Sequence, residues 1–432
     1  MSARIRAVEP LRGSASTRRG ATGTGAKLAA LTVAHAANYA FPVVFALVCA
    51  RMLGPAQYGV VAFYTALMSY VAVLIEFGLD PIGVRQVNSD GRPSHARQVM
   101  WNVTWAKLTI CLPTCLVIGF TLLATGSAGG LSVGFAMILY LVAYSLEPGW
   151  YLRSLELVRS VMVVALVSRI GGVVLLLSIV KSREDVALAV WAYTFVAWAN
   201  CIVGWLIMWQ RGVIGPPQVD RAQMRALFRS GGAVVGGNLS SHSVVTVGIA
   251  VLGALADPVV TGAANMALRI RSAAVATYLP LSQMGFVRLS TLVGSDRPGA
   301  VAFGRRLFYV LMAWSLLLSL VIGLEADRIA ALFYGLPEAP EAAGLLLRLV
   351  ALGLPAYVAH SQFGIQGLTL FRRERAYLLI SVVAAIIFFG LLFSLHASNP
   401  ASYGWALLAS DTWTALAAGL CLRQAAKCND QA

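Results

Sequence analysis

Polar residues recur at helical spacing inside one long apolar segment in the second half of the chain. Arg269 shares a helical face with neighbours three, four and seven residues away, namely Ser272, Asn265 and Gly262. It follows Pro258, which opens the segment, by 11 residues, so at 1.5 Å per residue it lies roughly 17 Å along a helix. A guanidinium can hold a phosphate through two parallel N–H donors. We therefore predict that Arg269 and Asn265 bind an anionic group.

Two further cations, Lys107 and Arg169, also lie well inside apolar segments. An ionisable side chain costs on the order of 3 kcal/mol at the centre of a bilayer unless it lines water or finds a partner. Each of the two either lines a cavity or extends its charged end to the nearer membrane surface. Both alternatives stay open, and both residues are candidate substrate ligands.

Weaker polar stripes stand on two other segments. His35 and Asn38 share one helical face, and Asn238 and His242 share another. Asn38, Asn238 and His242 are candidate substrate ligands, with hydrogen bonding between helices as the alternative. The six cysteines include no Cys-x-x-Cys pair, so the sequence predicts neither a metal site nor a disulfide framework.

Carboxylates are scarcer in the apolar segments. Asp411 stands about eight residues into the last segment, roughly 12 Å deep, where a carboxylate must be protonated or paired. It either pairs with an arginine, Arg269 being one candidate, or binds a coupling ion. Glu76, Asp80 and Arg85 cluster at one end of the second segment, where they either fix a helix end through ion pairs or form a gate.

An aromatic face is predicted on the fourth segment. Four residues repeat at intervals of four, three and four positions, namely Tyr140, Tyr144, Glu147 and Tyr151. Packing between helices is one interpretation of this face. The other is a surface on which sugar rings stack.

The elements that hold these residues are membrane helices. A mean hydropathy of +0.76 with 12% charged residues over 432 positions lies outside the range of soluble domains. Runs of about 20 apolar residues, the length that crosses roughly 30 Å of hydrocarbon, recur with short polar gaps. They lack the period-two alternation of barrel strands. The sequence predicts an all-α integral membrane protein with twelve spans, at 28–53, 59–82, 99–124, 131–151, 157–180, 186–209, 232–255, 259–287, 302–324, 342–370, 377–396 and 403–422.

Positive charge gathers in alternate gaps between these spans, as short cytoplasmic loops require. The opposite gaps hold only Arg51, Lys181, Arg183 and Arg328, and the longest of them, 325–344, is acidic. We therefore predict that both termini are cytoplasmic. The net charge of +15 follows the loops instead of forming one patch, which argues against nucleic-acid binding.

An internal repeat relates the two halves of the chain. An Asn early in a span, an apolar run and then Pro-x-x-x-Gly occur as Asn38, Pro55 and Gly59, and again at 238, 258 and 262. Six spans separate the copies, so the halves are predicted to be parallel repeats with a cavity between them near the midplane. The predicted organisation is a cytoplasmic basic tail (1–27), an N-lobe (28–210), a cytoplasmic linker (211–231), a C-lobe (232–422) and a cytoplasmic tail (423–432).

The gaps also limit the chemistry that the chain can perform. The longest are about 20 residues, too short for a catalytic domain, so we predict that the chain is not an enzyme and has no cofactor. Arg51 lies beside the hairpin "RMLGPAQYG", where it is expected to anchor the helix at the interface and not to bind substrate.

The stretch "ARMLGPAQYG" followed by "EFGLDPIGVR" resembles the N-terminal signature of Wzx-type polysaccharide flippases. These belong to the multidrug/oligosaccharidyl-lipid/polysaccharide (MOP) exporter superfamily. The stretches "EPGWYLRSLE", "VTGAANMALRI" and "ALFYGLPEAPEAAGLLLRLVALGLPAY" fit as well, so the resemblance runs from Leu28 to Leu422. Glu76 stands where such proteins often have Asp before Phe-Gly, a conservative difference.

The resemblance implies two six-helix lobes around a cationic cavity. It also implies translocation of undecaprenyl-pyrophosphate-linked oligosaccharide from the cytoplasmic to the periplasmic leaflet of the bacterial inner membrane, by alternating access. The product would enter lipopolysaccharide (O-antigen), capsule or exopolysaccharide synthesis, with a polysaccharide polymerase and a chain-length regulator as partners and a proton or sodium gradient as the driving force. The alternative is a drug/cation antiporter of the same superfamily, which would favour deep carboxylates such as Asp411 over arginines. A membrane glycosyltransferase or polymerase fits less well, because it would need a sizeable periplasmic loop.

Overall fold

The computed structural model describes residues 38–90, 92–125, 128–295, 297–335, 339–371, 373–396 and 399–430. Within these ranges, the structure does not describe the side chains at 90, 122, 124, 125, 128, 129, 230–245, 294, 295, 297, 374 and 425–430. The described part contains helices and no strand, which confirms the all-α prediction.

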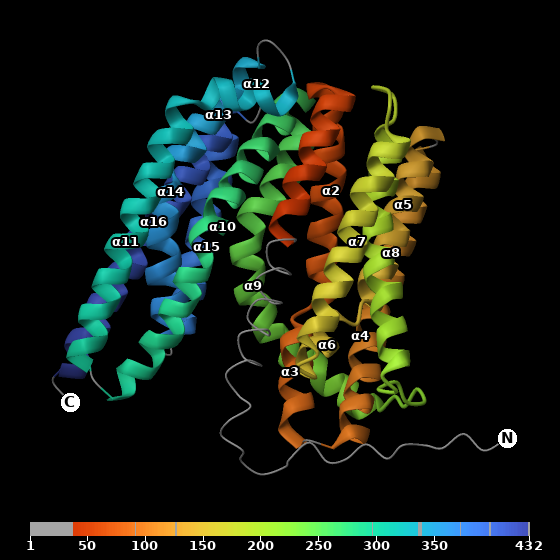
Figure 1. Cartoon of the computed structure of the whole chain (residues 1–432), viewed down its shortest axis with the longest axis horizontal. Coiled ribbons are helices and arrows are strands. Elements are labelled where there is room, and N and C mark those ends of the chain that lie inside the picture. The colour runs from red at the N-terminus through yellow and green to blue at the C-terminus, as the bar shows by residue number, and fades with distance from the viewer. Residues whose placement is uncertain are drawn as a thin grey trace.

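The first half of the chain forms the group of helices on the right of Figure 1. The helix α8 packs against both α7 and α5, and α5 packs against α4. The bounds of the helices in this group are Asn38–Leu53, α2 (Pro55–Glu76), α3 (Leu79–Asp90), α4 (Pro93–Thr125), α5 (Ala128–Leu146), α6 (Gly149–Ser154), α7 (Val158–Ile179) and α8 (Val186–Gln210).

The second half forms the centre and the left of the view, coloured from green to blue (Figure 1). In it, α16 packs against α15, α13 and the π-helix η1, and α10 packs against α11 and α13. The bounds are α9 (Arg221–Leu255), α10 (Pro258–Ser295), α11 (Arg297–Leu324), α12 (Ala326–Tyr334), α13 (Glu341–Leu352), α14 (Leu354–Ala359), η1 (His360–Leu368), α15 (Glu374–Ser394) and α16 (Pro400–Asp430).

Eight helices of the described part are long and apolar enough to cross a membrane, or nine if α13 and the segment after it form one bent span. Asn38–Leu53 and Thr246–Leu255 are shorter apolar helices, and α10 carries the polar stripe of Arg269. Within the described residues, each of the twelve predicted spans lies on one or more helices. Residues 28–37 of the first span lie outside the described residues, and twelve membrane crossings remain a prediction.

The structure refines four predicted segments. The acidic gap 325–344 contains the helix α12 in its first half. The span 342–370 bends by 41° at Gly353 and continues into η1. The second span, 59–82, lies within the candidate span Pro55–Ser89, which contains a turn where Phe77 and Gly78 adopt positive φ angles of 47° and 65°. The fourth, 131–151, lies within the candidate span Gly130–Ser154, which contains the Pro148 turn between α5 and α6.

The two copies of the repeated motif meet where the halves of the chain join. The helix α2 packs against both α9 and α10, and the first turns of α2 and α10 lie backbone to backbone. A Cβ on Gly59 would lie 1.7 Å from the carbonyl oxygen of Pro258, and one on Gly262 would lie 3.0 Å from that of Pro55. Only glycine permits this approach at position 59. The motif therefore forms the junction between the lobes, whose boundaries at 210 and 232 stay a prediction.

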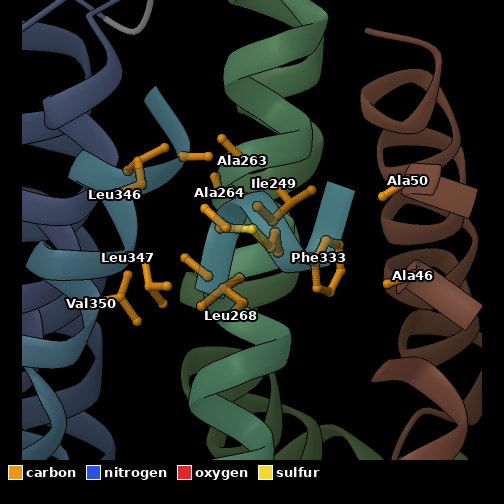
Figure 2. Close-up of a cluster of buried hydrophobic side chains, with 14 of the residues drawn as sticks. Ala46, Ala50, Ile249, Ala263, Ala264, Leu268, Phe333, Leu346, Leu347 and Val350 are labelled. Carbon is orange, nitrogen blue, oxygen red and sulfur yellow. The ribbon is translucent and has the colours of Figure 1, made fainter. Parts of the chain in front are cut away.

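Small side chains continue this junction into the largest buried core. That core contains Ala46 and Ala50 of the first helix together with Ala263 and Ala264 of α10. In Figure 2 the two α10 alanines lie between the first helix and Leu346 of α13. The two halves of the chain thus share one continuous core through short side chains.

Candidate substrate site between the lobes

A narrow hollow, with a cavity volume of about 10 Å³, lies between the first helix, α2, α8 and α10. Its lining combines aromatic, small and polar side chains from both halves of the chain. The lining residues are Pro42, Phe45, Ala46, Tyr58, Val61, Ala62, Thr65, Tyr193, Asn265 and Arg269. Arg269 and Asn265, the two residues of the predicted polar stripe with functional side chains, both face this hollow.

Arg269 brings an uncompensated positive charge to the hollow. Its side chain is half-buried, and its Nε is buried without a hydrogen-bond partner. None of the ion pairs in the described part of the chain involves this guanidinium. A cation held in this way favours an anionic ligand.

Tyr58 supplies a second donor that the sequence analysis missed. The Asn265 side-chain amide donates to the Tyr58 hydroxyl at 3.0 Å, which leaves the Tyr58 O–H free to donate. Tyr58 also lies close enough to Arg269 for a direct electrostatic interaction. The residue stands in the repeated motif, three positions after Pro55, and this position was the signal that could have singled it out.

Lys107 is not among the residues that line the hollow. It is 2% exposed, and its Nζ pairs with Asp80 at 2.5 Å. A predicted substrate ligand and a predicted gate residue are thus partners. Glu76, the other carboxylate of the cluster, accepts a hydrogen bond of 2.8 Å from the Tyr144 hydroxyl. Asp80 is thus paired with Lys107 and not with Arg85, whose side chain is exposed, and the choice between an ion-pair cluster and a gate stays open.

Arg169 lies deeper in the same lobe. Its Nη1 donates weakly to Asn200 at 3.5 Å, and its Nε is buried without a partner. Glu147 and Tyr193 both interact electrostatically with it. Tyr193 also lines the hollow of Arg269, so this side chain neighbours both Arg169 and the hollow.

The aromatic face predicted on the fourth span is partly confirmed. Tyr140 stacks on Tyr193 at 5.6 Å between ring centroids and on Tyr144 at 6.3 Å, which gives a row of rings from the hollow to Glu76. Tyr151 does not belong to this face, because the chain turns at Pro148 before it and buries it in a separate core with Trp150.

Asp411 lies in the other lobe and pairs with an arginine, but not with Arg269. Its Oδ2 accepts a hydrogen bond of 2.6 Å from Arg271, and its Oδ1 lies 3.1 Å from Nδ1 of His360. Arg271 also lies over the ring of Tyr357, 4.3 Å from its centroid. The predicted alternative that Arg269 neutralises Asp411 is therefore wrong, because Arg271 points to another face of α10 and reaches α16.

The remaining predicted residues lie elsewhere. The side chain of Asn38 is exposed, and those of Asn238 and His242 lie outside the described residues. Arg51, expected as an interfacial anchor, donates to the carbonyl oxygen of Leu332 in α12 at 2.6 Å. In the part of the chain that the structure describes, no three metal-binding side chains cluster.

Comparison with known proteins adds the family. The family described as "Polysaccharide biosynthesis protein" matches residues 24–286, more than half of the chain. The chain belongs to this family. Within it, a protein of Escherichia coli (strain K12) that carries the provisional name of O-antigen transporter is 22% identical over 369 residues, which cover 84% of this chain and 88% of the relative. A Shigella dysenteriae protein with the same provisional name is 22% identical over 276 residues, 62% of this chain and 67% of the relative.

Solved structures show the fold of this polysaccharide biosynthesis protein. An inward-facing multidrug resistance MATE family transporter of the MOP superfamily aligns with a TM-score of 0.68 and 14% identity, over 92% of this chain and 97% of the other. A MOP superfamily transporter from Pyrococcus furiosus aligns with a TM-score of 0.59 and 12% identity, over 91% and 93%. The predicted resemblance to MOP flippases is confirmed in family and fold.

Proposed function

We propose that this polysaccharide biosynthesis protein is a transporter, and not an enzyme, that moves a lipid-linked oligosaccharide between the two leaflets of a membrane. The substrate class is undecaprenyl-pyrophosphate-linked repeat units, which enter O-antigen, capsule or exopolysaccharide synthesis. The membrane is the bacterial inner membrane, with both chain termini in the cytoplasm. A polymerase and a chain-length regulator would take up the product on the outer side.

The observation that carries the proposal is the guanidinium of Arg269 in the hollow between the lobes, which forms no ion pair with any described residue. A pyrophosphate cannot cross hydrocarbon unaided, because its charges would lose their water. Arg269 and the free O–H of Tyr58 offer donors that replace that water. Arg169, which interacts with Tyr193 of the hollow, would be a second cation near the same diphosphate.

Alternating access is supported by the way the lobes meet. The junction of α2 with α10 uses glycine and alanine, which let two backbones pack closely without interlocking side chains. Lobes joined by such a surface can rock against each other around a central site.

The test is surface polysaccharide in a strain that lacks its own flippase, with membrane levels of each variant matched. Arg269→Ala should abolish polymer, and Arg269→Lys should leave only part of it, because lysine lacks the bidentate geometry. Arg328→Ala is the matched control, since that arginine is 81% exposed and pairs with Glu325 three residues earlier. Normal polymer from Arg269→Ala would remove the substrate-binding role.

A drug/cation antiporter is the second candidate, favoured by the MATE fold. Such a protein would need a carboxylate free to meet a cation. Asp411 is already held by Arg271 and His360, and the hollow is lined by no carboxylate. Resistance of a drug-sensitive strain to cationic dyes, unchanged on expression of the chain, would exclude this function.

A further inference from the structure

The C-terminal half contains a buried network that the hollow does not use. Asp411 stands at its centre, with one carboxylate oxygen held by Arg271 and the other by Nδ1 of His360. The second ring nitrogen of His360, Nε2, lies 3.4 Å from the hydroxyl of Tyr377 on α15. The network thus joins α10, α16, η1 and α15 through one histidine.

Two donors in this network have no hydrogen-bond partner among the described residues. They are Nη1 of Arg271 and the hydroxyl of Tyr278, in residues only 6% and 5% exposed. The two side chains also interact electrostatically. Buried donors of this kind are normally satisfied by an ordered water, so we expect a water beside the ion pair.

His360 can bind a proton here without breaking either of its contacts. In the neutral ring, Nδ1–H donates to Asp411 and Nε2 accepts from the O–H of Tyr377. When a proton binds at Nε2, both ring nitrogens donate, and the Tyr377 hydroxyl turns to become the acceptor. One proton is gained, and only the orientation of the Tyr377 hydroxyl changes. The net charge of Asp411, Arg271 and His360 therefore rises from zero to +1.

The charged and titratable groups of this network come from the elements around His360. They are Asp411 and Tyr403 of α16, Arg271 and Tyr278 of α10, Tyr357 of α14, Tyr377 of α15, and Tyr39 of the first helix, which interacts with Tyr278 and Tyr357. The Tyr357 ring meets the His360 ring edge-on at 5.8 Å. Asp411 is the only carboxylate among the described groups around this ring, and Arg271 neutralises it. Of the residue types in this set, histidine is the one whose charge ordinarily changes between about pH 5 and pH 8.

His360 also stands at the place where the backbone departs from an α-helix. It is the first residue of η1, seven residues after the 41° bend at Gly353. π-Helical turns inside α-helices occur mostly at functional sites. A change in charge at this point acts on a segment whose hydrogen bonds are already rearranged.

Sodium fits this site poorly. A cation of that kind needs several free oxygen ligands, in the way that hard cations in proteins take carboxylate and carbonyl oxygens. Both oxygens of Asp411 are occupied, one of them by a guanidinium. A metal cation would have to displace a positively charged neighbour.

We propose that His360 is a proton-binding residue and that its protonation shifts the chain between its two transport conformations. The proposal rests on the proposed function for its purpose, since a flippase of charged lipid needs a driving force. It deepens that function by naming the ion as a proton and the carrier as His360 instead of Asp411.

The experiment follows conformation and does not need the substrate. Thr65 lines the hollow, so Thr65→Cys in a cysteine-free full-length chain reports access of a water-soluble maleimide to it. In lipid vesicles the labelling rate should change several-fold between about pH 5.5 and about pH 8.5, on either side of the ordinary histidine pKa of about 6.5. His360→Asn keeps an N–H toward Asp411 but cannot titrate, and should make the rate independent of pH.

Two matched variants and one ion control separate the explanations. His396→Gln changes an exposed histidine and should keep the pH response of the parent. Arg269→Ala should also keep the pH response. If this variant loses surface polymer but keeps the pH response, the substrate-binding role of Arg269 and the proton-binding role of His360 are tested separately. His360→Gln serves in place of His360→Asn if that variant does not purify as a folded protein.

A pH response that survives in both His360 variants would overturn the proposal. A labelling rate that differs between sodium and potassium at constant pH, and that is unaffected by the substitution at position 360, would also overturn it. A metal cation bound elsewhere would then control the conformation.

Discussion

Each lobe contains an ion pair beneath a tyrosine ring, but the two pairs are built differently. In the C-terminal half, Arg271 and Asp411 are 6% and 7% exposed and hydrogen-bonded, and Arg271 lies 4.3 Å from the Tyr357 centroid. In the N-terminal half, Lys107 is 2% exposed but its partner Asp80 is 19% exposed, and their contact lacks hydrogen-bond geometry. The first pair joins the interiors of two helices. The second closes a break between α2 and α3.

The difference shows that the same pairing can serve rigidity or adaptability. The planar guanidinium of Arg271 fixes the direction of the carboxylate, which leaves the opposite oxygen for His360. The ammonium of Lys107 acts as a point charge and tolerates movement of the short α3 segment. The C-terminal half is therefore the lobe in which loss of one charged partner should cost most.

The largest expected effect comes from removing one partner of the enclosed pair. Asp411→Ala leaves Arg271 charged and buried, which should lower the free energy of unfolding by about 3–5 kcal/mol. Lys107→Ala leaves Asp80 within reach of water and should cost about 1–2 kcal/mol. The measurement is reversible unfolding of the purified chain in mixed detergent.

The double substitution Arg271→Met with Asp411→Leu is the control for this prediction. Removing both charges should recover most of the loss, because no unpaired charge is left. Equal losses from Asp411→Ala and Lys107→Ala would contradict the distinction between the two lobes.

The repeated motif offers the same substitution once in each lobe. Gly59→Ala places a methyl group 1.7 Å from the Pro258 carbonyl oxygen, so the lobes must separate, at about 1–3 kcal/mol. Gly262→Ala meets its nearest atom at 3.0 Å, and a shift of a few tenths of an ångström relieves it. Maleimide labelling of Thr65→Cys in each background measures the separation. Identical labelling of the two variants would contradict the expectation that the junction tolerates a methyl group at position 262 better than at position 59.

The smallest expected effect lies in two loops that occupy corresponding positions in the two halves of the predicted repeat. Asp185 accepts from the backbone N–H groups of Lys181 and Ser182, which hold the pKa of its carboxyl below the usual range. In the other half, Asn399 accepts from the backbone N–H of Ala401 at 3.0 Å without any charge. Asp185→Asn converts the first kind of loop into the second.

Because the pKa of Asp185 is lowered on folding, its stabilisation is present above the ordinary carboxyl pKa of about 3.9 and is lost as pH falls through the folded value. The variant should therefore unfold slightly earlier than the parent at neutral pH and together with it in strong acid. Thermal unfolding at the two pH values measures this, and a difference that persists in acid would mean that charge is not the cause.

The sequence was sufficient for the helices and for the residue at the centre of the hollow, because both follow from local rules. Apolar length located the spans, and helical spacing joined Arg269 to Asn265. The break at Phe77 and the π-helix at His360 were missed, since both depend on packing against other helices and not on local composition.

Partners were harder to predict than positions. Lys107 and Asp80 are 27 residues apart, and Arg271 and Asp411 are 140 apart. Periodicity relates residues on one helix and not residues on different helices. Whether Arg269 or Arg271 is the partner of Asp411 therefore depends on how α10 is oriented about its own axis, which the sequence does not give. The same holds for His360, whose significance comes from two residues on two other helices.

The contact of Arg51 with α12 has a genetic consequence. The guanidinium donates to the main-chain oxygen of Leu332, and its stem packs beside Gly335. Every amino acid supplies a carbonyl oxygen, so the codon for position 332 can drift without removing the acceptor. The contact therefore has one mutable partner, and suppressors of an Arg51 substitution should arise outside position 332, in residues that set where α12 ends.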